Sequence, residues 1–243
     1  MARFRELDFR PTPMGDLVLR ERWDPIARVD LLEIKLGDEF LMSSLFTVSE
    51  TALGTLAMAD TPGERLDVVV GGLGLGCTAL AVLEDPRVRE LVVLDALPEV
   101  IEWHREHLIP AGVTLADDDR VRLEHGDFFA ALRPDGELDT TRPGRRWDAI
   151  VVDIDHTPGH HLHPSHADLY DAAGLSRVAY RLNPGGVFAL WSDTSPDDAL
   201  VGTLREVFAS ARAEVVTFAN PLTGGTSSAT IYLASTGGAP ADV

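Results

Sequence analysis

Short apolar runs, separated by polar segments rich in glycine and proline, dominate the chain from residue 66 onwards. Runs of four to six residues with many Val, Ile and Leu are typical of strands buried on both faces of a parallel sheet. The predicted strands are residues 68–70, 91–94, 121–124, 147–152 and 187–191. Helical segments lie between them, at residues 78–83, 98–108, 167–181 and 197–211. Two late strands, 214–218 and 229–234, predict an antiparallel edge on this sheet.

The first part of the chain has a different pattern. Residues 1–14 are polar and contain two prolines, which predicts a loosely ordered lead-in. Apolar positions then alternate in 16–22 and 26–36, which is a hairpin signal, and 40–42 is a candidate third strand. A helix follows at 48–59.

The segments between these predicted strands and helices are expected to be loops and turns. Residues 109–120 and 133–146 are expected to be polar loops, and the Asn-Pro-Gly-Gly segment at 183–186 a turn. We therefore predict an N-terminal β-hairpin region (1–46), a Rossmann-like α/β domain (47–236) and a flexible tail (237–243).

Composition narrows the class of protein. The 243 residues carry 39 acidic and 21 basic side chains, a net charge of −18, which argues against a nucleic-acid partner. No apolar run approaches membrane-spanning length and residues 1–10 lack the apolar core of a signal peptide, so a cytoplasmic protein without a membrane partner is expected. The single cysteine, Cys77, is interpreted as a packing residue rather than a reactive thiol.

A glycine-rich turn directly follows the first central strand. Gly71, Gly72, Gly74 and Gly76 permit a tight turn and let a ligand lie against the backbone. Asp95 ends the next strand about 20 residues later, where an acid can accept hydrogen bonds from ribose hydroxyls. Strand, glycine turn, helix and terminal acid together predict a nucleoside site.

More acids follow the later strands. Asp127 comes after the third strand, and Asp153 and Asp155 come after the fourth. Ligands of open α/β sheets bind at this edge, although each acid could also be a helix cap or turn residue. Five histidines lie in the adjoining segment 156–166; its prolines and glycine favour a loop over the alternative, a metal site.

These motifs resemble the class I AdoMet-dependent methyltransferase fold and, more narrowly, the spermidine synthase (polyamine aminopropyltransferase) family over about residues 15–235. The resemblance is carried by the N-terminal β region, the glycine run, LVVLDALPEVIEWHRE, HGDFFAAL, WDAIVVDIDHTPG and the NPGG turn. It implies a seven-stranded Rossmann-like sheet and a homodimer that uses the N-terminal β region.

The resemblance also assigns roles by motif. Asp95 matches the acid that binds the ribose hydroxyls, Asp127 the acid that contacts the adenine amino group, and Asp153 the candidate general base. In the family, the loop that carries this base has a second acid, which matches either Asp155 or His156. Glu50 matches an acid of the acceptor site. The predicted cofactor-binding residues are Gly72, Leu73, Gly74, Gly76, Asp95, Ala96, Asp127, Phe128 and Asp153, with no metal ligand.

The sequence departs from the family at the glycine turn. The family's GGGDGG places an acid against the free amine of decarboxylated AdoMet, whereas this chain has GGLGLG with Gly74 at that position. An aspartate would repel the carboxylate of intact AdoMet, and Gly74 removes that repulsion. Val48 and Ser49 also replace the tyrosine and histidine that precede the family's acceptor-site acid.

The sequence therefore predicts an AdoMet-dependent transferase, with methyl transfer to a small-molecule acceptor as the leading reaction. The acceptor is expected to enter over the loop 153–166, with the N-terminal hairpins as the opposite wall. Three alternatives remain: aminopropyl transfer from decarboxylated AdoMet, a non-catalytic nucleoside-binding protein and a nicotinamide dehydrogenase. The late antiparallel strand pair argues against the dehydrogenase.

Overall fold

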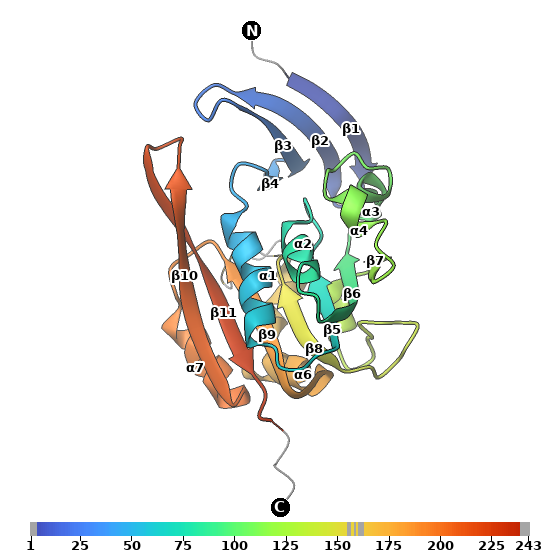
Figure 1. Ribbon diagram of the computed structural model, residues 1–243, viewed down its shortest axis with the longest axis vertical. Coiled ribbons are helices and arrows are strands. Elements are labelled where there is room, and N and C mark those ends of the chain that lie inside the picture. The colour runs from blue at the N-terminus through green and yellow to red at the C-terminus, as the bar shows by residue number, and fades with distance from the viewer. Residues whose placement is uncertain (1–3, 155–156, 158, 160–162, 239–243) are drawn as a thin grey trace, which may run out of the picture.

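The computed structural model describes residues 4–154, 157, 159 and 163–238. Its centre is a seven-stranded sheet with the strand order β10-β11-β9-β8-β5-β6-β7 (Figure 1). Five strands are parallel, and β11 pairs antiparallel with both β9 and β10, as predicted. The strands are β5 (Leu66–Gly71), β6 (Val88–Asp95), β7 (Val121–His125), β8 (Trp147–Val152), β9 (Leu182–Ser192), β10 (Ser210–Asn220) and β11 (Gly225–Ser235).

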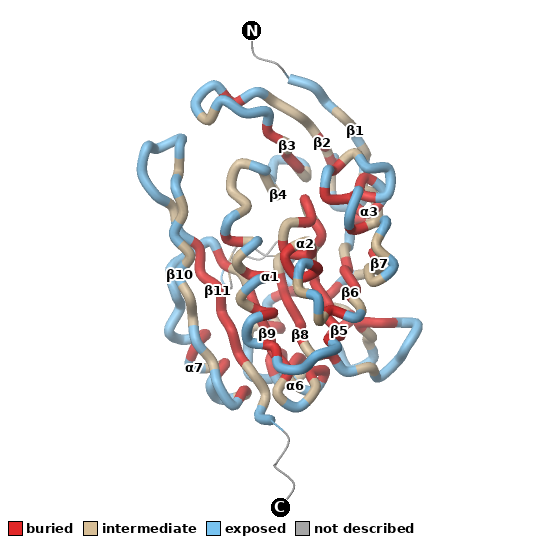
Figure 2. The backbone as a smooth tube through the Cα atoms, viewed as in Figure 1, coloured by how far each residue is buried: buried red, intermediate tan, exposed pale blue. Residues whose placement is uncertain are grey.

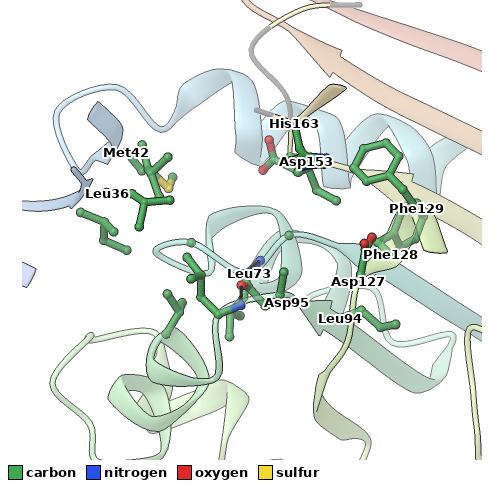
Figure 3. A pocket seen from close by; sticks show the side chains of 18 of the residues that line it. Leu36, Met42, Leu73, Leu94, Asp95, Asp127, Phe128, Phe129, Asp153 and His163 are labelled. Atoms are coloured by element: carbon green, nitrogen blue, oxygen red, sulfur yellow. Dashed lines mark hydrogen bonds between the residues drawn. The ribbon is translucent and has the colours of Figure 1, made fainter. Parts of the chain in front are cut away.

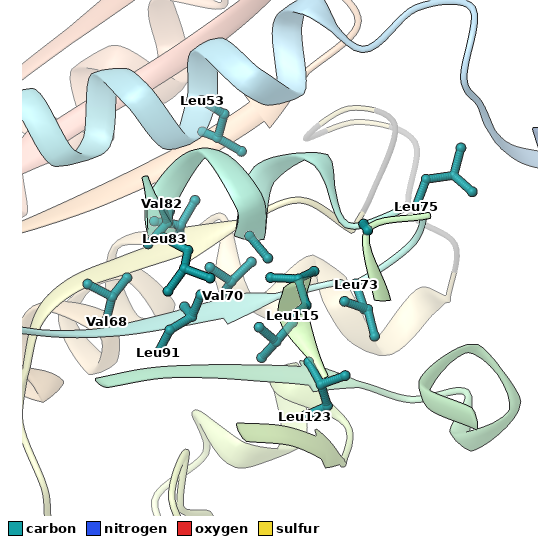
Figure 4. Close-up of a cluster of buried hydrophobic side chains, with 14 of the residues drawn as sticks. Leu53, Val68, Val70, Leu73, Leu75, Val82, Leu83, Leu91, Leu115 and Leu123 are labelled. Atoms are coloured by element: carbon teal, nitrogen blue, oxygen red, sulfur yellow. The ribbon is translucent and has the colours of Figure 1, made fainter. Parts of the chain in front are cut away.

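Helices cover both faces of this sheet. The helices are α1 (Val48–Asp60), α2 (Cys77–Leu83), α3 (Pro98–Arg105), α4 (Gly112–Leu115), α5 (Phe128–Ala131), α6 (Ala172–Arg181) and α7 (Asp198–Val207), with a 3₁₀ helix η1 (Pro164–Leu169) before α6. Val68 and Val70 pack in the core under α1 to α4 (Figure 4), whereas Val69 packs in the core under α5 to α7. This alternation buries β5 on both faces (Figure 2), because side chains of a strand point to opposite sides. The predicted fold class is confirmed.

A separate antiparallel sheet precedes this domain, with the order β1-β2-β3-β4. Its strands are β1 (Phe4–Thr12), β2 (Gly15–Asp24), β3 (Val29–Leu36) and β4 (Glu39–Ser43). Leu17, Leu19 and Ile34 are buried and belong to the same core cluster as α1 to α4. The N-terminal sheet is therefore fixed against the main domain on the side of the glycine turn.

The predicted lead-in over residues 1–14 was wrong from residue 4 onwards, because β1 pairs with β2 along its whole length. The indole N–H of Trp103, in α3, also donates to Asp8 Oδ2 at 2.7 Å. Pro11 is compatible with this strand because β1 is an edge, where a missing N–H need not break a ladder hydrogen bond. Pairing with the next strand, together with a contact from the distant Trp103, orders a sequence that is locally polar.

Four further predictions need correction. The loop 109–120 contains α4, because Ile109 and Leu115 are buried against the main core. Residues 183–186 lie inside β9 as a bulge, where Gly185 has a φ of +78°. The helix predicted at 167–181 is divided into η1 and α6, and the Asp171 carboxylate caps α6 by accepting from Gly174 N at 2.7 Å. The helix predicted at 197–211 ends at 207, where β10 soon begins.

The charged loop 133–146 is held by buried ion pairs. They lie at the end of the sheet where β5 and β6 begin, whereas the glycine turn lies at the end where β5 finishes. The Asp139 side chain is fully buried and lies 3.0 Å from Arg145 and 2.6 Å from Arg122. Arg145 also reaches Asp67 and Glu90, both at 2.9 Å. Burial acts to raise the pKa of Asp139, but the hydrogen bond from the Thr141 hydroxyl and the guanidinium groups of Arg145 and Arg122 together hold this pKa well below its usual range.

In the described part of the chain, no helix is long and apolar enough to cross a membrane. The cytoplasmic location stays a prediction. Most of the predicted tail lies outside the described residues.

Candidate functional site

The glycine turn between β5 and α2 lies directly against the end of β8. Gly72 has a φ of +93°, and a Cβ on it would lie 2.1 Å from the carbonyl oxygen of Asp153. Gly74 has a φ of +46°, and a Cβ there would lie 3.0 Å from Met42 Sδ in β4. Glycine at these positions therefore provides a left-handed backbone and close approach to two neighbouring segments.

Asp95 supports this turn from the end of β6. One carboxylate oxygen accepts from Leu73 N at 2.9 Å and the other accepts from Leu97 N at 2.8 Å. Burial raises the pKa of Asp95, and these backbone N–H donors oppose that rise. Each oxygen keeps a further lone pair, which a ribose hydroxyl can use.

Asp127 caps a helix at one end of the site. It precedes α5, and its Oδ1 accepts from Ala130 N at 3.0 Å. The ring of Phe128 covers Gly71, where a Cβ would lie 2.6 Å from it. Phe129 stacks on the ring of His166 with centroids 3.7 Å apart and planes 11° apart. Asp127 thus has a structural role and also borders an aromatic region of the cavity.

Glu50 and Asp153 form a pair of acids beside the glycine turn. The Thr78 hydroxyl lies 2.6 Å from Asp153 Oδ2 and 3.1 Å from the carbonyl oxygen of Glu50. Burial raises the pKa of Asp153 to about 6, which the Thr78 hydrogen bond opposes. Burial, and then the charge of Asp153, raises the pKa of Glu50 to about 7. Two carboxyl groups near neutral pKa can exchange protons with a ligand at physiological pH.

These groups line one cavity of about 350 Å³ between the two sheets (Figure 3). Its described lining has four acids, Glu50, Asp95, Asp127 and Asp153, and no Lys or Arg. Cavities that bind small molecules generally measure about 300–1,000 Å³, so this volume is large enough for a small ligand. The charge of the lining suits a cationic ligand.

Most of the residues predicted for the site line this cavity: Glu50, Gly72, Leu73, Gly74, Asp95, Ala96, Asp127, Phe128 and Asp153. Gly76 does not line it; this residue precedes α2, and a Cβ there would lie 2.8 Å from Leu115 Cδ1. Asp155 and His156 lie outside the described residues. In the described part of the chain, no group of His, Cys, Asp and Glu could hold a metal ion.

Sequence reasoning missed several lining residues. The N-terminal wall was predicted without naming its side chains, which are Met14, Ile34, Leu36, Leu41 and Met42. Trp191 lines the cavity from β9, and His163 and His166 line it from the start of η1. Only the five-histidine segment gave a signal, since the others look like ordinary core residues in the sequence.

Cys77 also lines the cavity. Burial, and then the charges of Glu50 and Asp153, raises the pKa of its thiol to about 12. The thiol is therefore protonated at neutral pH, which agrees with a packing role.

No family model matches the chain. In sequence it is 33% identical over 168 residues to polyamine aminopropyltransferase 2 of Pseudomonas aeruginosa, covering 64% of this chain and 44% of that protein. It is 33% identical over 133 residues to the polyamine aminopropyltransferase of Corynebacterium efficiens, covering 54% of this chain and 23% of that protein. The chain thus matches less than half the length of either protein. Its homologues are polyamine aminopropyltransferases.

Solved structures agree on the fold. A spermidine synthase in complex with the transition-state analogue AdoDATO has a TM-score of 0.74 at 17% identity, covering 98% of this chain and 75% of that one. The spermidine synthase of Thermotoga maritima has a TM-score of 0.71, with the same identity and coverage. The resemblance predicted from the motifs, to the spermidine synthase-like family, is confirmed.

Proposed function

We propose that the chain transfers an alkyl group from a sulfonium nucleoside to the nitrogen of a small amine. One observation carries the proposal: Glu50 and Asp153 lie together beside the Gly72–Gly74 turn, in a cavity that Asp95 and Asp127 also line. The nucleoside would lie along the turn, with its ribose at Asp95 and its adenine near Asp127 and Phe128. The acceptor amine would then lie beside the acid pair.

The residues of this site would bind, orient and deprotonate the reactants. The sulfonium of the donor, when bound, activates the carbon attached to it for displacement. The amine nitrogen forms the new C–N bond while the C–S bond breaks, and the electron pair of that bond goes to sulfur, giving a neutral thioether. Asp153 accepts the proton that the amine loses, and its pKa of about 6 lets it pass that proton to solvent at neutral pH.

Aminopropyl transfer from decarboxylated AdoMet is the first candidate reaction. The curated relatives support it better than the methyl transfer that the sequence alone favoured. The acidic lining also supports it, because the donor then carries both a sulfonium and an ammonium group. An acceptor with a free amine, rather than a phenol or a carboxylate, fits the acid pair.

Methyl transfer from AdoMet is the second candidate, and Gly74 is the observation that favours it. A side chain at this position would point towards Met42 in the cavity lining, so Gly74 leaves that part of the turn without a carboxylate. Intact AdoMet has its own carboxylate and needs no acid there.

Titration calorimetry with AdoMet, decarboxylated AdoMet and methylthioadenosine would test the proposal, followed by transfer assays with each donor. Tighter binding of decarboxylated AdoMet than of AdoMet favours aminopropyl transfer, and the reverse favours methyl transfer. Failure of all three nucleosides to bind would refute the proposal. Asp153→Asn should bind the nucleosides nearly as well as the parent protein and lose turnover; loss of both would mean that Asp153 is structural.

We also propose that the protein is a homodimer that uses its N-terminal sheet. Phe4, Trp23, Ile26, Val29 and Phe40 are large apolar side chains of this region, and each is exposed. Exposed apolar side chains gathered on one region are typical of a protein–protein interface. Light scattering at micromolar concentration should give twice the mass of the 26.3 kDa chain, and a monomer would refute this.

A further inference from the structure

The peptide unit that joins Gly74 to Leu75 in the glycine turn is held at both of its polar atoms. Its carbonyl oxygen lies 3.0 Å from His104 Nε2 in α3, and its N–H donates to Met42 Sδ in β4 at 3.2 Å. The side chains of Leu73 and Leu75, on either side of Gly74, are buried in the main core cluster (Figure 4). The peptide is therefore clamped between α3 and the N-terminal sheet.

The contact with Gly74 also fixes the hydrogen on the His104 ring. A carbonyl oxygen can only accept, so Nε2 carries the hydrogen. His104 is fully buried, and burial lowers the pKa of its ring, which the hydrogen bond to Gly74 opposes; the ring is therefore neutral at physiological pH. Within the described part of the chain, the Nδ1 atom has no hydrogen-bond partner. A buried acceptor without a partner weakens folding, so the chain loses stability by keeping an imidazole here.

Two glycines make room for His104. A Cβ on Gly76 would lie 2.9 Å from His104 Cε1, which is closer than two non-bonded carbon atoms approach. A Cβ on Gly112, in α4, would lie 2.1 Å from the carbonyl oxygen of His104. The turn and α4 can therefore pack directly on this residue, which explains why the turn needs Gly76 although Gly76 does not line the cavity.

His104 can influence a ligand only through the turn. Gly74 lines the cavity, whereas His104 is not among the described residues that line it. Gly74 has a φ of +46°, and a glycine adopts positive and negative φ about equally well, so its peptide can rotate. The hydrogen bond from His104 favours one orientation of this peptide. A binding site that is formed only part of the time binds its ligand more weakly in the same proportion.

We propose that His104 is a positioning residue for the nucleoside: its Nε2–H holds the Gly74 carbonyl, so that the turn keeps the shape against which the nucleoside lies. The inference rests on the proposed function, in which the nucleoside lies along this turn. Without the hydrogen bond, the buried carbonyl oxygen is unpaired and the peptide rotates to find another partner. The affinity for the nucleoside should then fall at least about fivefold.

Glutamine and methionine at residue 104 separate the hydrogen bond from the packing. Both side chains are unbranched and similar in size, but only glutamine can donate an N–H to the Gly74 carbonyl. Titration calorimetry with methylthioadenosine on the full chain should show His104→Met binding at least about fivefold more weakly than the parent, and His104→Gln within about twofold of it. An unchanged affinity in His104→Met, or equal losses in the two variants, would overturn the inference.

Thr61→Val is the matched control for a general loss of stability. It removes another buried hydrogen bond from a side chain to a backbone carbonyl, the 2.7 Å contact of the Thr61 hydroxyl with Ala57 at the end of α1. This variant should lose stability in urea unfolding and bind methylthioadenosine as the parent does. A loss of affinity as large as that of His104→Met would mean that affinity merely follows stability, which would also overturn the inference.

The parent protein allows a second test that does not depend on the folding of a variant. The ¹⁵N resonances of a histidine ring distinguish its two neutral tautomers from each other and from the imidazolium ion. At neutral pH the ring of His104 should be the neutral tautomer with its hydrogen on Nε2. The other tautomer, or the imidazolium ion, would contradict the proposed contact.

The proposed function and the role of His104 fail in different ways. If no nucleoside binds the parent protein, the proposed function is wrong and the role of His104 falls with it. If methylthioadenosine binds the parent and His104→Met equally well, the nucleoside site stands and only the role of His104 is wrong.

Discussion

Replacing Asp153 by asparagine should stabilise the ligand-free protein at neutral pH while it removes the proposed base. Burial raises the pKa of Asp153 from an ordinary value of 3.8 to about 6. An acid whose pKa is higher in the folded state loses its proton first in the unfolded chain, so its ionisation weakens folding as the pH rises through this interval. Asparagine keeps an acceptor for the Thr78 hydroxyl and carries no charge.

The size of the effect follows from the shift. A difference of about two pH units corresponds to roughly 3 kcal/mol once the carboxyl is fully ionised, near pH 8. Near pH 4.5, where the folded protein keeps this proton, the gain from Asp153→Asn should be only about 1 kcal/mol. Glu50 adds to the gain at higher pH, because the charge of Asp153 helps to raise its pKa.

Urea unfolding of the parent and variant proteins without ligand, at pH 4.5 and pH 8, measures this difference directly. Asp135→Asn is the matched control, because it removes the same charge from an exposed side chain. The control separates the burial of Asp153 from the general benefit of lowering a net charge of −18. A gain for Asp153→Asn that is equal at both pH values, or no larger than that of Asp135→Asn, would refute the reasoning.

Three further predictions concern the donor, the base and the fold. Gly74→Asp should weaken the binding of AdoMet relative to that of decarboxylated AdoMet, and this effect should be about tenfold larger than for Gly74→Asn. Both new residues tolerate a positive φ and only aspartate is charged. Calorimetry with both nucleosides checks this, and equal effects of the two variants would contradict it. Thr78→Val removes the 2.6 Å hydrogen bond to Asp153 and should move the acidic limb of the pH–rate profile upwards by about one pH unit. Thr78→Ser should restore the original profile. An unmoved limb would show that this hydroxyl does not lower the pKa of the base. Asp139→Asn leaves Arg145 and its neighbours without a central acid and should cost about 3 kcal/mol or more in urea unfolding at pH 7; a loss below about 1 kcal/mol, the range of an exposed ion pair, would mean that the network does not hold the loop 133–146.

The central sheet could be predicted because its signals are local. Residues 68–70 form a strand because three β-branched side chains precede a glycine turn, and Asp95 follows its strand directly in the sequence. Parallel strands of an open sheet bring their carboxyl ends to one edge, so Asp95, Asp127 and Asp153 could be placed together without coordinates. The structure added that Asp95 also holds the turn and that Asp127 also caps α5.

The N-terminal strand and most of the acceptor wall could not be predicted, because contacts outside each segment decide them. The strand β1 is polar, and it is ordered by hydrogen bonds to β2 and by the contact of Asp8 with Trp103, 95 residues away. Leu41 and Met42 look like ordinary strand residues until β4 is placed beside the glycine turn. No local pattern distinguishes a leucine that lines a cavity from one that fills a core.

The sequence by itself determined the sheet, the glycine turn and the acids at the strand ends, because each depends on residues close together in the chain. Only the tertiary structure decided which side chains face those acids. Thr78 meets Asp153 across 75 residues, and Trp191 reaches the cavity because β9 lies beside β8. The chemistry of the cavity follows from that packing, which brings together segments that lie far apart in the sequence.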